Sequence, residues 1–397
     1  MTDYSDLSFD WCSEVLTDIG YSIQARRILE PLYKGGANIK LIQNEAYMPA
    51  ERLLDLPIWK QRIEDSEKME DTGIRISFSV PSLYRKASKG LNIGYTMWET
   101  TRYPREWMGE INSLDRFWVG SEALVKSAKE SGVRVPVDAV TACLDTTEWD
   151  SEGAGVEFAG LDEDTIVFMY IGSWIPRKNF PDLLTAFACE FDGQSDVALV
   201  IKTWGGDNSA NFRSQVTGAL QGHLNSLQGV SRPKISLIMD ILEEKQIMKM
   251  LRRANIYTSP SRGEGFDLPL VQAMACGCLP VVNNFLAHGD YVTKDNAILY
   301  DWSYTPVYNA AVPLYHAYQQ WSAPDLGSYM KSLREAYNIF RDDKDKLKKM
   351  TDNARETVQE HYDPVKNADR IATLIREVSE NATKGDPTKE LVAAPVS

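Results

Sequence analysis

The sequence predicts an α/β fold with two doubly wound domains that face each other across a cleft. A chain of 397 residues is long for one hydrophobic core, so two domains are expected. Strand-like and helix-like segments alternate along two stretches, which is typical of parallel sheets covered by helices. The stretch DSEGAGVEFAGLDED, rich in glycine and acidic residues, separates the two series. We therefore expect a first domain at residues 1–155 and a second at 161–362.

The first series alternates four strand-like segments with helical ones. The strand candidates are NIKLIQ (38–43), IRISFSV (74–80), LNIGYTM (91–97) and RFWVG (116–120). After the turn that contains Tyr21, apolar residues recur at helical spacing, and Pro31 is expected to kink or end that helix. A further helix is predicted in PREWMGEINSL, where Pro104 occupies a favoured first-turn position.

The second series begins with TIVFMYIG (165–172), whose nearly unbroken apolar sequence is typical of a parallel strand buried on both faces. The elements expected after it are the helix FPDLLTAF, the strand VALVIK (197–202), a helix from about Ser209, the strand KISLI, a helix around EKQIMKMLRRA and the strand NIYTSP. The segment SRGEGFDLPLVQAMACG and the strand LPVVN complete the series.

The C-terminal part is charged and helical. The mixed signs of RDDKDKLKK at helical spacing favour a solvated helix face over a cation site. Pro364 separates a last helix, predicted at 365–380 within the C-terminal segment 363–380, from the helix before it. We expect that helix to pack back toward the first domain, and residues 381–397 to form a mobile tail.

Charge and composition narrow the class of protein. The formal net charge is −13, from 43 Lys and Arg against 56 Asp and Glu, which disfavours bare nucleic acid as a partner. The five cysteines are scattered and predict reduced thiols; Cys276 and Cys278 lack a second pair that would complete a metal site. The acidic N-terminus and the lack of a long apolar run predict a cytoplasmic protein without a transmembrane segment, with peripheral membrane contact left open.

The segment SRGEGFDLPLVQAMACG is the first candidate for a ligand site. It follows a strand and leads into a helix, and open α/β sheets bind ligands beyond the carboxyl ends of their strands. The helix N-terminus attracts an anion such as a phosphate. Gly263 and Gly265 either bring the backbone close to a ligand or adopt positive φ, while Glu264 between them accepts hydrogen bonds from sugar hydroxyls. Gln272 needs a polar partner if buried, and ribose hydroxyls are one candidate.

A second candidate loop, GSWIPRKN, follows the buried strand of the second domain. Its adjacent cations, Arg177 and Lys178, are suited to a diphosphate, and Lys202 closes the strand VALVIK in a similar way. Taken singly, each of these residues also fits a solvated surface position. Their shared placement at strand ends of one domain favours a site for a diphosphate sugar.

The acceptor side is expected on the first domain. Trp98 and Glu99 follow the strand LNIGYTM, so they should face the cleft, and Tyr21 lies in the first loop. Aromatic rings at such positions stack against sugar faces, although a chain with ten Trp and eighteen Tyr also uses them in its core.

Four segments resemble glycosyltransferases of family 4, which retain the anomeric configuration and have the GT-B fold of two Rossmann-like domains. SRGEGFDLPLVQAMACG resembles their Glu-x7-Glu signature region, and YIGSWIPRKNFPDLLTAF their strand, R-K-N loop and helix. IGYTMWETTRYPREWMGEINSLDRFWVGSEALVKSAKESGV and GYSIQARRILEPL are similar to their acceptor domain and its first loop. The resemblance covers roughly residues 9 to 380.

The resemblance implies roles for individual residues. Arg177 and Lys178 would bind the donor diphosphate, and Glu264 the hydroxyls of the transferred sugar; these three are the catalytic candidates. The donor-binding candidates are Gly172, Lys202, Gly263, Gly265, Phe266, Asp267, Leu268 and Gln272. Two positions depart from the family pattern, because Gln272 replaces the second Glu and Asp267 replaces a common Gly. Glutamine still accepts a hydrogen bond through its carbonyl oxygen, so ribose binding can survive in weaker form.

The resemblance also implies a reaction. A sugar moves from a nucleotide-diphosphate donor to an acceptor hydroxyl of a polysaccharide or lipid-linked glycan, with a protein or a modified nucleic-acid base left open. The departing phosphate takes the acceptor proton, so no metal and no cofactor are expected. Two alternatives remain open at this point: an epimerase or phosphorylase-like enzyme on a similar scaffold, and a non-catalytic sugar-binding or assembly subunit.

Overall fold

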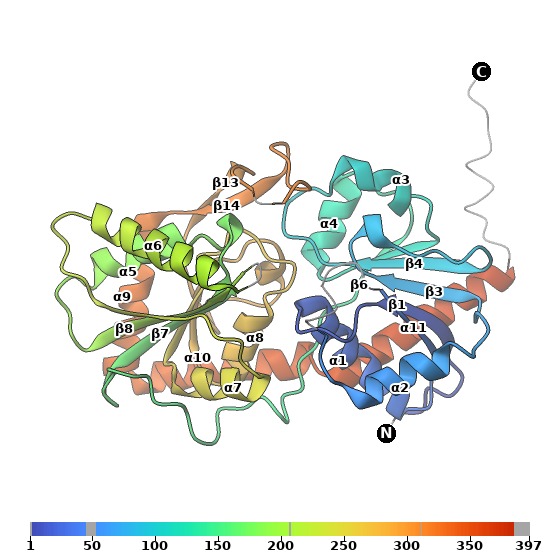
Figure 1. Cartoon of the computed structure of the whole chain (residues 1–397), viewed down its shortest axis with the longest axis horizontal. Helices are drawn as coiled ribbons and strands as arrows, with labels where there is room; N and C mark the ends of the chain where they lie inside the picture. Colours follow the sequence, from blue (N-terminus) through green and yellow to red (C-terminus); the bar gives the residue numbers. More distant parts are fainter. Residues whose placement is uncertain (1, 45–52, 206–207, 311, 385–397) are drawn as a thin grey trace.

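The computed structural model confirms the predicted class, with two parallel α/β units side by side (Figure 1). It describes residues 2–44, 53–205, 208–310 and 312–384. Within these residues, no helix has both the length and the apolar composition needed to cross a lipid bilayer.

The first unit contains a sheet of six parallel strands in the order β2-β1-β3-β4-β5-β6. The strands are β1 Ser8–Ser13, β2 Asn38–Gln43, β3 Ile74–Phe78, β4 Leu91–Thr96, β5 Arg116–Val119 and β6 Val137–Ala139. The helices are α1 Gly20–Lys34, α2 Pro57–Ser66, α3 Met108–Ile111 and α4 Glu122–Glu130, with short 3₁₀ helices η2 Pro81–Leu83 and η3 Arg105–Trp107.

Several features of this unit differ from the sequence prediction, and neither strand β6 nor helix α2 was predicted. Strand β1 was not predicted, because Asp10 interrupts its apolar pattern; the carboxylate is buried but receives two hydrogen bonds from the Arg75 guanidinium, at 3.1 and 2.9 Å. Helix α1 does not end at Pro31 but continues to Lys34, since a proline this close to the end disrupts little of the helix. Tyr21 accordingly lies in the first turn of α1 rather than in a loop.

The second unit contains six parallel strands in the order β12-β11-β10-β7-β8-β9. The strands are β7 Ile166–Ser173, β8 Val197–Trp204, β9 Lys234–Ile238, β10 Ile256–Thr258, β11 Leu279–Val282 and β12 Ile298–Leu299. The helices are α5 Phe180–Glu190, α6 Ala210–Ser226, α7 Glu244–Arg253, α8 Leu268–Ala275, α9 Leu326–Asp342 and α10 Lys344–His361, with 3₁₀ helices η4 Pro176–Lys178 and η5 Leu286–Asp290. Read from β9, this is the Rossmann order, and its topological switch point lies between β7 and β10.

Two elements link the units in addition to the segment between β6 and β7. Helix α11, Pro364–Lys384, follows α10 and packs against α1, and its apolar residues such as Ile371 and Ile375 belong to the hydrophobic core of the first unit (Figure 1). The helix extends past residue 380; the remainder of the predicted tail, 385–397, lies outside the described residues.

The second connection is an antiparallel hairpin of β13 Trp302–Pro306 and β14 Gln320–Pro324, which the sequence did not predict. It leaves the second unit and contacts the first. The Thr101 amide donates to the Gln320 carbonyl at 3.2 Å, the Gln320 amide donates to the Thr101 hydroxyl at 3.1 Å, and the Arg105 amide donates to the Tyr318 hydroxyl at 2.8 Å.

Candidate active site

The two loops at the switch point of the second sheet lie against each other. One follows β7 and contains Arg177 and Lys178; the other follows β10 and contains Glu264. The Arg262 amide donates to the Arg177 carbonyl at 2.9 Å, and the Asn179 side chain donates to the Pro260 carbonyl at 3.2 Å. The two loops therefore form one continuous surface at the point where a doubly wound sheet binds its ligand.

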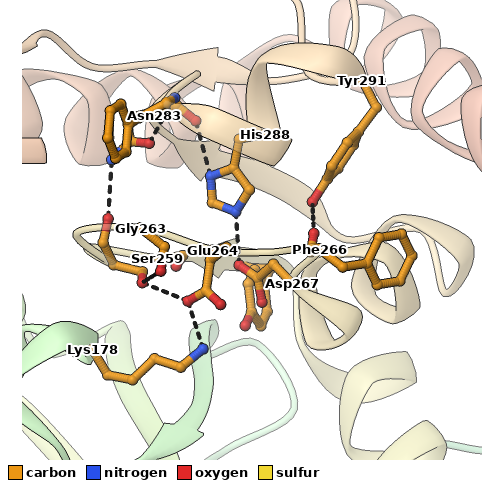
Figure 2. A network of polar contacts seen from close by, with 12 residues as sticks. Lys178, Ser259, Gly263, Glu264, Phe266, Asp267, Asn283, His288 and Tyr291 are labelled. Atoms are coloured by element: carbon orange, nitrogen blue, oxygen red, sulfur yellow. Dashed lines mark hydrogen bonds and ion pairs between the residues drawn. The ribbon is translucent and has the colours of Figure 1, made fainter. Parts of the chain in front are cut away.

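Arg177, Lys178 and Glu264 converge on this surface in a buried ion cluster. Figure 2 shows the pair formed by Lys178 and Glu264. Lys178 Nζ lies 2.6 Å from Glu264 Oε1, and Arg177 lies 3.0 Å from Glu264 Oε2. The Ser261 hydroxyl also donates to Glu264, and Arg177 donates to the Gly263 carbonyl at 2.6 Å. The cations thus contact the acid directly, instead of facing it across a space.

Opposite charges set the ionisation of the cluster. Burial by itself would raise the pKa of Glu264, but Lys178 and Arg177 lower it to about 2. Burial would likewise lower the pKa of Arg177, yet the carboxylates of Glu264 and Glu99 raise it well above its usual value. Both groups are therefore charged at neutral pH, in surroundings where charge–charge interactions are weakly screened.

Glu99 brings the first domain into the cluster. Its carboxylate lies 3.5 Å from Arg177, and Tyr315 of the β13–β14 hairpin donates to it at 2.9 Å. The four charged side chains balance, with two cations against two carboxylates. Arg177 Nε has no hydrogen-bond partner among the described residues, and the Lys178 ammonium has three donors, so both retain capacity for a further acceptor.

The glycines beside Glu264 permit contact between the domains. Neither Gly263 nor Gly265 has a positive φ, so that alternative of the prediction is wrong, and both glycines lie close to the backbone of the first domain. A Cβ on Gly265 would lie 3.0 Å from the Trp98 amide nitrogen, and one on Gly263 would overlap the Glu99 carbonyl oxygen. Glycine at 263 and 265 therefore lets the Glu264 loop rest on the end of β4.

The positive φ in this loop occurs at Asp267, where φ is 70°. Asp267 precedes α8 and departs from the glycine of the family pattern. Its carboxylate lies 2.9 Å from His288 Nε2, and His288 Nδ1 lies 3.1 Å from the Asn283 carbonyl (Figure 2). Tyr291 donates to the Phe266 carbonyl at 2.8 Å. Glycine adopts a positive φ without strain, whereas aspartate does not. The contacts of Asp267 and Phe266 hold this backbone turn in place.

The remaining donor-side candidates lie nearby but outside the ion cluster. Lys202 pairs in register with Ile171, next to Gly172, and its buried ammonium lies 4.9 Å from the centre of the Trp204 ring. A Cβ on Gly172 would press on the Lys178 side chain at 3.3 Å. Within the described residues, no ion pair or side-chain hydrogen bond joins Lys202 or Gln272 to the cluster. Phe266 is buried, and Leu268 begins α8.

The acceptor-side candidates, Tyr21, Trp98 and Glu99, line one cavity of about 300 Å³. Trp98 is otherwise a core residue, 3 % exposed, whose indole N–H donates to Thr100. Ser261, His288 and Tyr315 were not identified from the sequence. Ser261 could have been found from its position three residues before Glu264 in the same loop. Nothing in the sequence connects His288 or Tyr315 with the Glu264 loop.

Comparisons with known proteins agree with this fold. Residues 156–301 match the family model described as glycosyl transferases group 1. No curated protein sequence matches the chain significantly.

Among solved structures, sucrose-phosphate synthase from Thermosynechococcus elongatus has a TM-score of 0.66 at 14 % identity, covering 94 % of this chain and 99 % of that one. HepE from Anabaena, in complex with UDP and glucose, has a TM-score of 0.62 at 11 % identity, covering 94 % of this chain and 100 % of that one. The trehalose-6-phosphate synthase OtsA has a TM-score of 0.63 at 9 % identity, covering 93 % and 99 %. At these identities the likeness shows the fold alone. Residues 156–301 are thus similar to the group 1 glycosyl transferases, and the two domains have the GT-B arrangement of these solved structures.

Proposed function

We propose that the protein transfers a sugar from a nucleotide-diphosphate donor to an acceptor hydroxyl, with retention of the anomeric configuration and without a metal ion. The observation that carries the proposal is the ion cluster of Arg177, Lys178 and Glu264 at the switch point of the second sheet. UDP-glucose is the first donor to test, because the HepE structure of the same fold holds it.

In the proposed reaction the bond between the sugar C1 and the diphosphate oxygen breaks, and C1 bonds to the acceptor oxygen on the same face. The acceptor proton passes to the departing phosphate oxygen. Negative charge grows on that phosphate in the transition state, and Arg177 and Lys178 stabilise it more strongly there than in the ground state. These fixed cations supply the charge neutralisation for which other enzymes use a metal ion.

Glu264 has two roles in this proposal. It keeps the two cations charged and in place in the free protein, and it accepts hydrogen bonds from the hydroxyls of the transferred sugar. Gln272, buried and without a side-chain hydrogen bond among the described residues, offers its amide to the ribose.

The test measures UDP-glucose consumption and UDP binding in Arg177→Ala and Glu264→Ala. Arg213→Ala is the matched control, since Arg213 is an exposed arginine of the same domain, paired only with Asp240 among the described residues. Both site variants should lose turnover by about a hundredfold or more, while the control keeps the wild-type rate. Wild-type turnover in folded Arg177→Ala and Glu264→Ala would refute the assignment.

A non-catalytic sugar-binding subunit is the second candidate, favoured by glutamine at position 272 and by the full neutralisation of the two cations in the free protein. Calorimetry separates the two functions. If the protein binds the donor but neither transfers nor hydrolyses it in any acceptor mixture, the result favours the sugar-binding subunit. If Gln272→Glu then turns the donor over, glutamine at position 272 is the cause of the missing activity.

A further inference from the structure

The cavity of about 300 Å³ beside Glu99 has a definite place in the fold. Tyr21 comes from the helix that follows β1, Val80 from the end of β3 and Met97 from the end of β4. Strands β1 and β3 are neighbours in the order β2-β1-β3-β4, where the connections reverse direction. The cavity is therefore at the switch point of the first sheet, the position at which such sheets bind ligands.

The β13–β14 hairpin forms one wall of the cavity from the other domain. Leu314 and Tyr315 of the hairpin complete its wall, and the Tyr315 ring lies 5.0 Å from the ring of Trp98, tilted by 31°. Glu99 belongs both to this wall and to the ion pair with Arg177 at 3.5 Å. The cavity and the candidate donor site therefore share one carboxylate.

The lining is poor in free polar groups. The Tyr21 hydroxyl already donates to the Met97 carbonyl at 3.1 Å and accepts from the Met97 amide at 2.9 Å, and the Tyr315 hydroxyl donates to Glu99. Apart from Ser82 and Glu99, the rest of the wall is apolar or aromatic. A hexose ring carries several hydroxyls, and each one buried here without a partner would cost about 1–3 kcal/mol.

The size of the cavity limits what enters. A volume of about 300 Å³ is at the lower end of small-molecule sites and holds one ring with a short substituent, and any longer part of an acceptor would extend into solvent. The rings of Tyr21, Trp98 and Tyr315 favour a flat apolar ring over a flexible alkyl chain, because ring pairs add attraction beyond the burial of area.

We propose that the acceptor is a hydroxyl carried on an aromatic ring compound, with the ring in this cavity and the hydroxyl at Glu99. The proposal rests on the proposed glycosyl transfer, because it takes Glu99 as the boundary between acceptor and donor. The carboxylate accepts a hydrogen bond from the acceptor hydroxyl and so orients its oxygen toward the donor site.

The test is a binding measurement, so it does not depend on turnover. Saturation-transfer NMR is recorded on the full chain with benzyl alcohol, glucose and 1-octanol in one mixture. Leu83→Trp fills the cavity from the half-buried end of η2, and Leu314→Asn makes the hairpin wall polar. Leu53→Trp is the matched control, because Leu53 is 45 % exposed and outside the cavity lining.

The expected result is saturation of the aromatic protons of benzyl alcohol, lost in Leu83→Trp and kept in Leu53→Trp, with affinity about tenfold weaker in Leu314→Asn. If Leu83→Trp does not fold, as judged by circular dichroism and UDP binding, Leu314→Asn decides alone. Preferential saturation of glucose or octanol, or benzyl alcohol binding unchanged in the folded cavity variants, overturns the proposal. A failure of the proposed function gives a different result, namely selective binding of benzyl alcohol with no transfer from any nucleotide sugar.

Discussion

Replacement of Gly263 by alanine tests whether the contact between the domains matters for activity. A Cβ at this position would overlap the Glu99 carbonyl oxygen, and it would lie 3.3 Å from the Trp321 ring. Because the Glu99 carbonyl oxygen is a backbone atom, no side-chain rotation relieves the overlap with it. The Glu264 loop and residue 99 must separate by roughly 1 Å, and a misplacement of that size costs about a hundredfold in rate when it affects reacting groups.

The assay compares kcat/KM for UDP-glucose in Gly263→Ala and Gly218→Ala. Gly218 is in α6, where an added Cβ meets nothing within 4 Å, so this variant controls for the substitution itself. We expect about a hundredfold loss in Gly263→Ala and none in Gly218→Ala. Near wild-type activity in Gly263→Ala, with the protein folded, would refute the reasoning that the two domains must touch here.

Three further predictions concern single side chains. Lys178 and Arg177 lower the pKa of Glu264 from 4.5 to about 2 against the effect of burial. The charge of Glu264 therefore stabilises the fold above about pH 4.5, and this stabilisation is lost as the pH falls toward 2. In that pH range, the thermal unfolding temperature of Glu264→Gln should depend less on pH than that of the wild type. Burial lowers the pKa of Lys202 to about 8, so calorimetric UDP affinity should fall as the pH rises through 8, and Lys202→Met should remove that dependence. Asp267→Gly and Asp267→Ala both lose the His288 contact, but only alanine is strained at the positive φ of 70°, so Asp267→Gly should be more stable in urea unfolding by about 1–2 kcal/mol. Equal stability of the two variants would show that the turn is unstrained.

The sequence was most informative where one local pattern determines the structure. Strand β7 is apolar along almost its whole length, so its burial at the centre of a parallel sheet could be predicted. Because β7 and β10 are parallel neighbours, they end at the same edge of the sheet, and the loops that follow them begin there. This brings Arg177 and Glu264 together. The convergence of these side chains thus followed from topology, while their direct pairing required side-chain geometry.

Features that depend on distant partners could not be predicted. The burial of Asp10 in β1 depends on Arg75, which is 65 positions away in the chain. The reason for glycine at 263 is the Glu99 backbone of the other domain, and the turn at Asp267 depends on His288. The hairpin that includes Tyr315 has little of the alternating pattern of a strand pair, and its contacts are with the first domain.

The charge balance at Arg177 links the two proposed ligand sites. Arg177 is shared between Glu264 of the second domain and Glu99 of the first, so a diphosphate that binds Arg177 competes with Glu99. If donor and acceptor bind as proposed, the diphosphate displaces Glu99 from Arg177, and the acceptor hydroxyl in the cavity becomes a hydrogen-bond partner of Glu99. Glu99→Gln removes the competing charge without removing the side chain, so UDP should bind more tightly to this variant than to the wild type, while transfer becomes slower because amide replaces carboxylate at the acceptor. Weaker UDP binding in Glu99→Gln, measured by calorimetry, would instead mean that Glu99 holds Arg177 in the position that the donor requires.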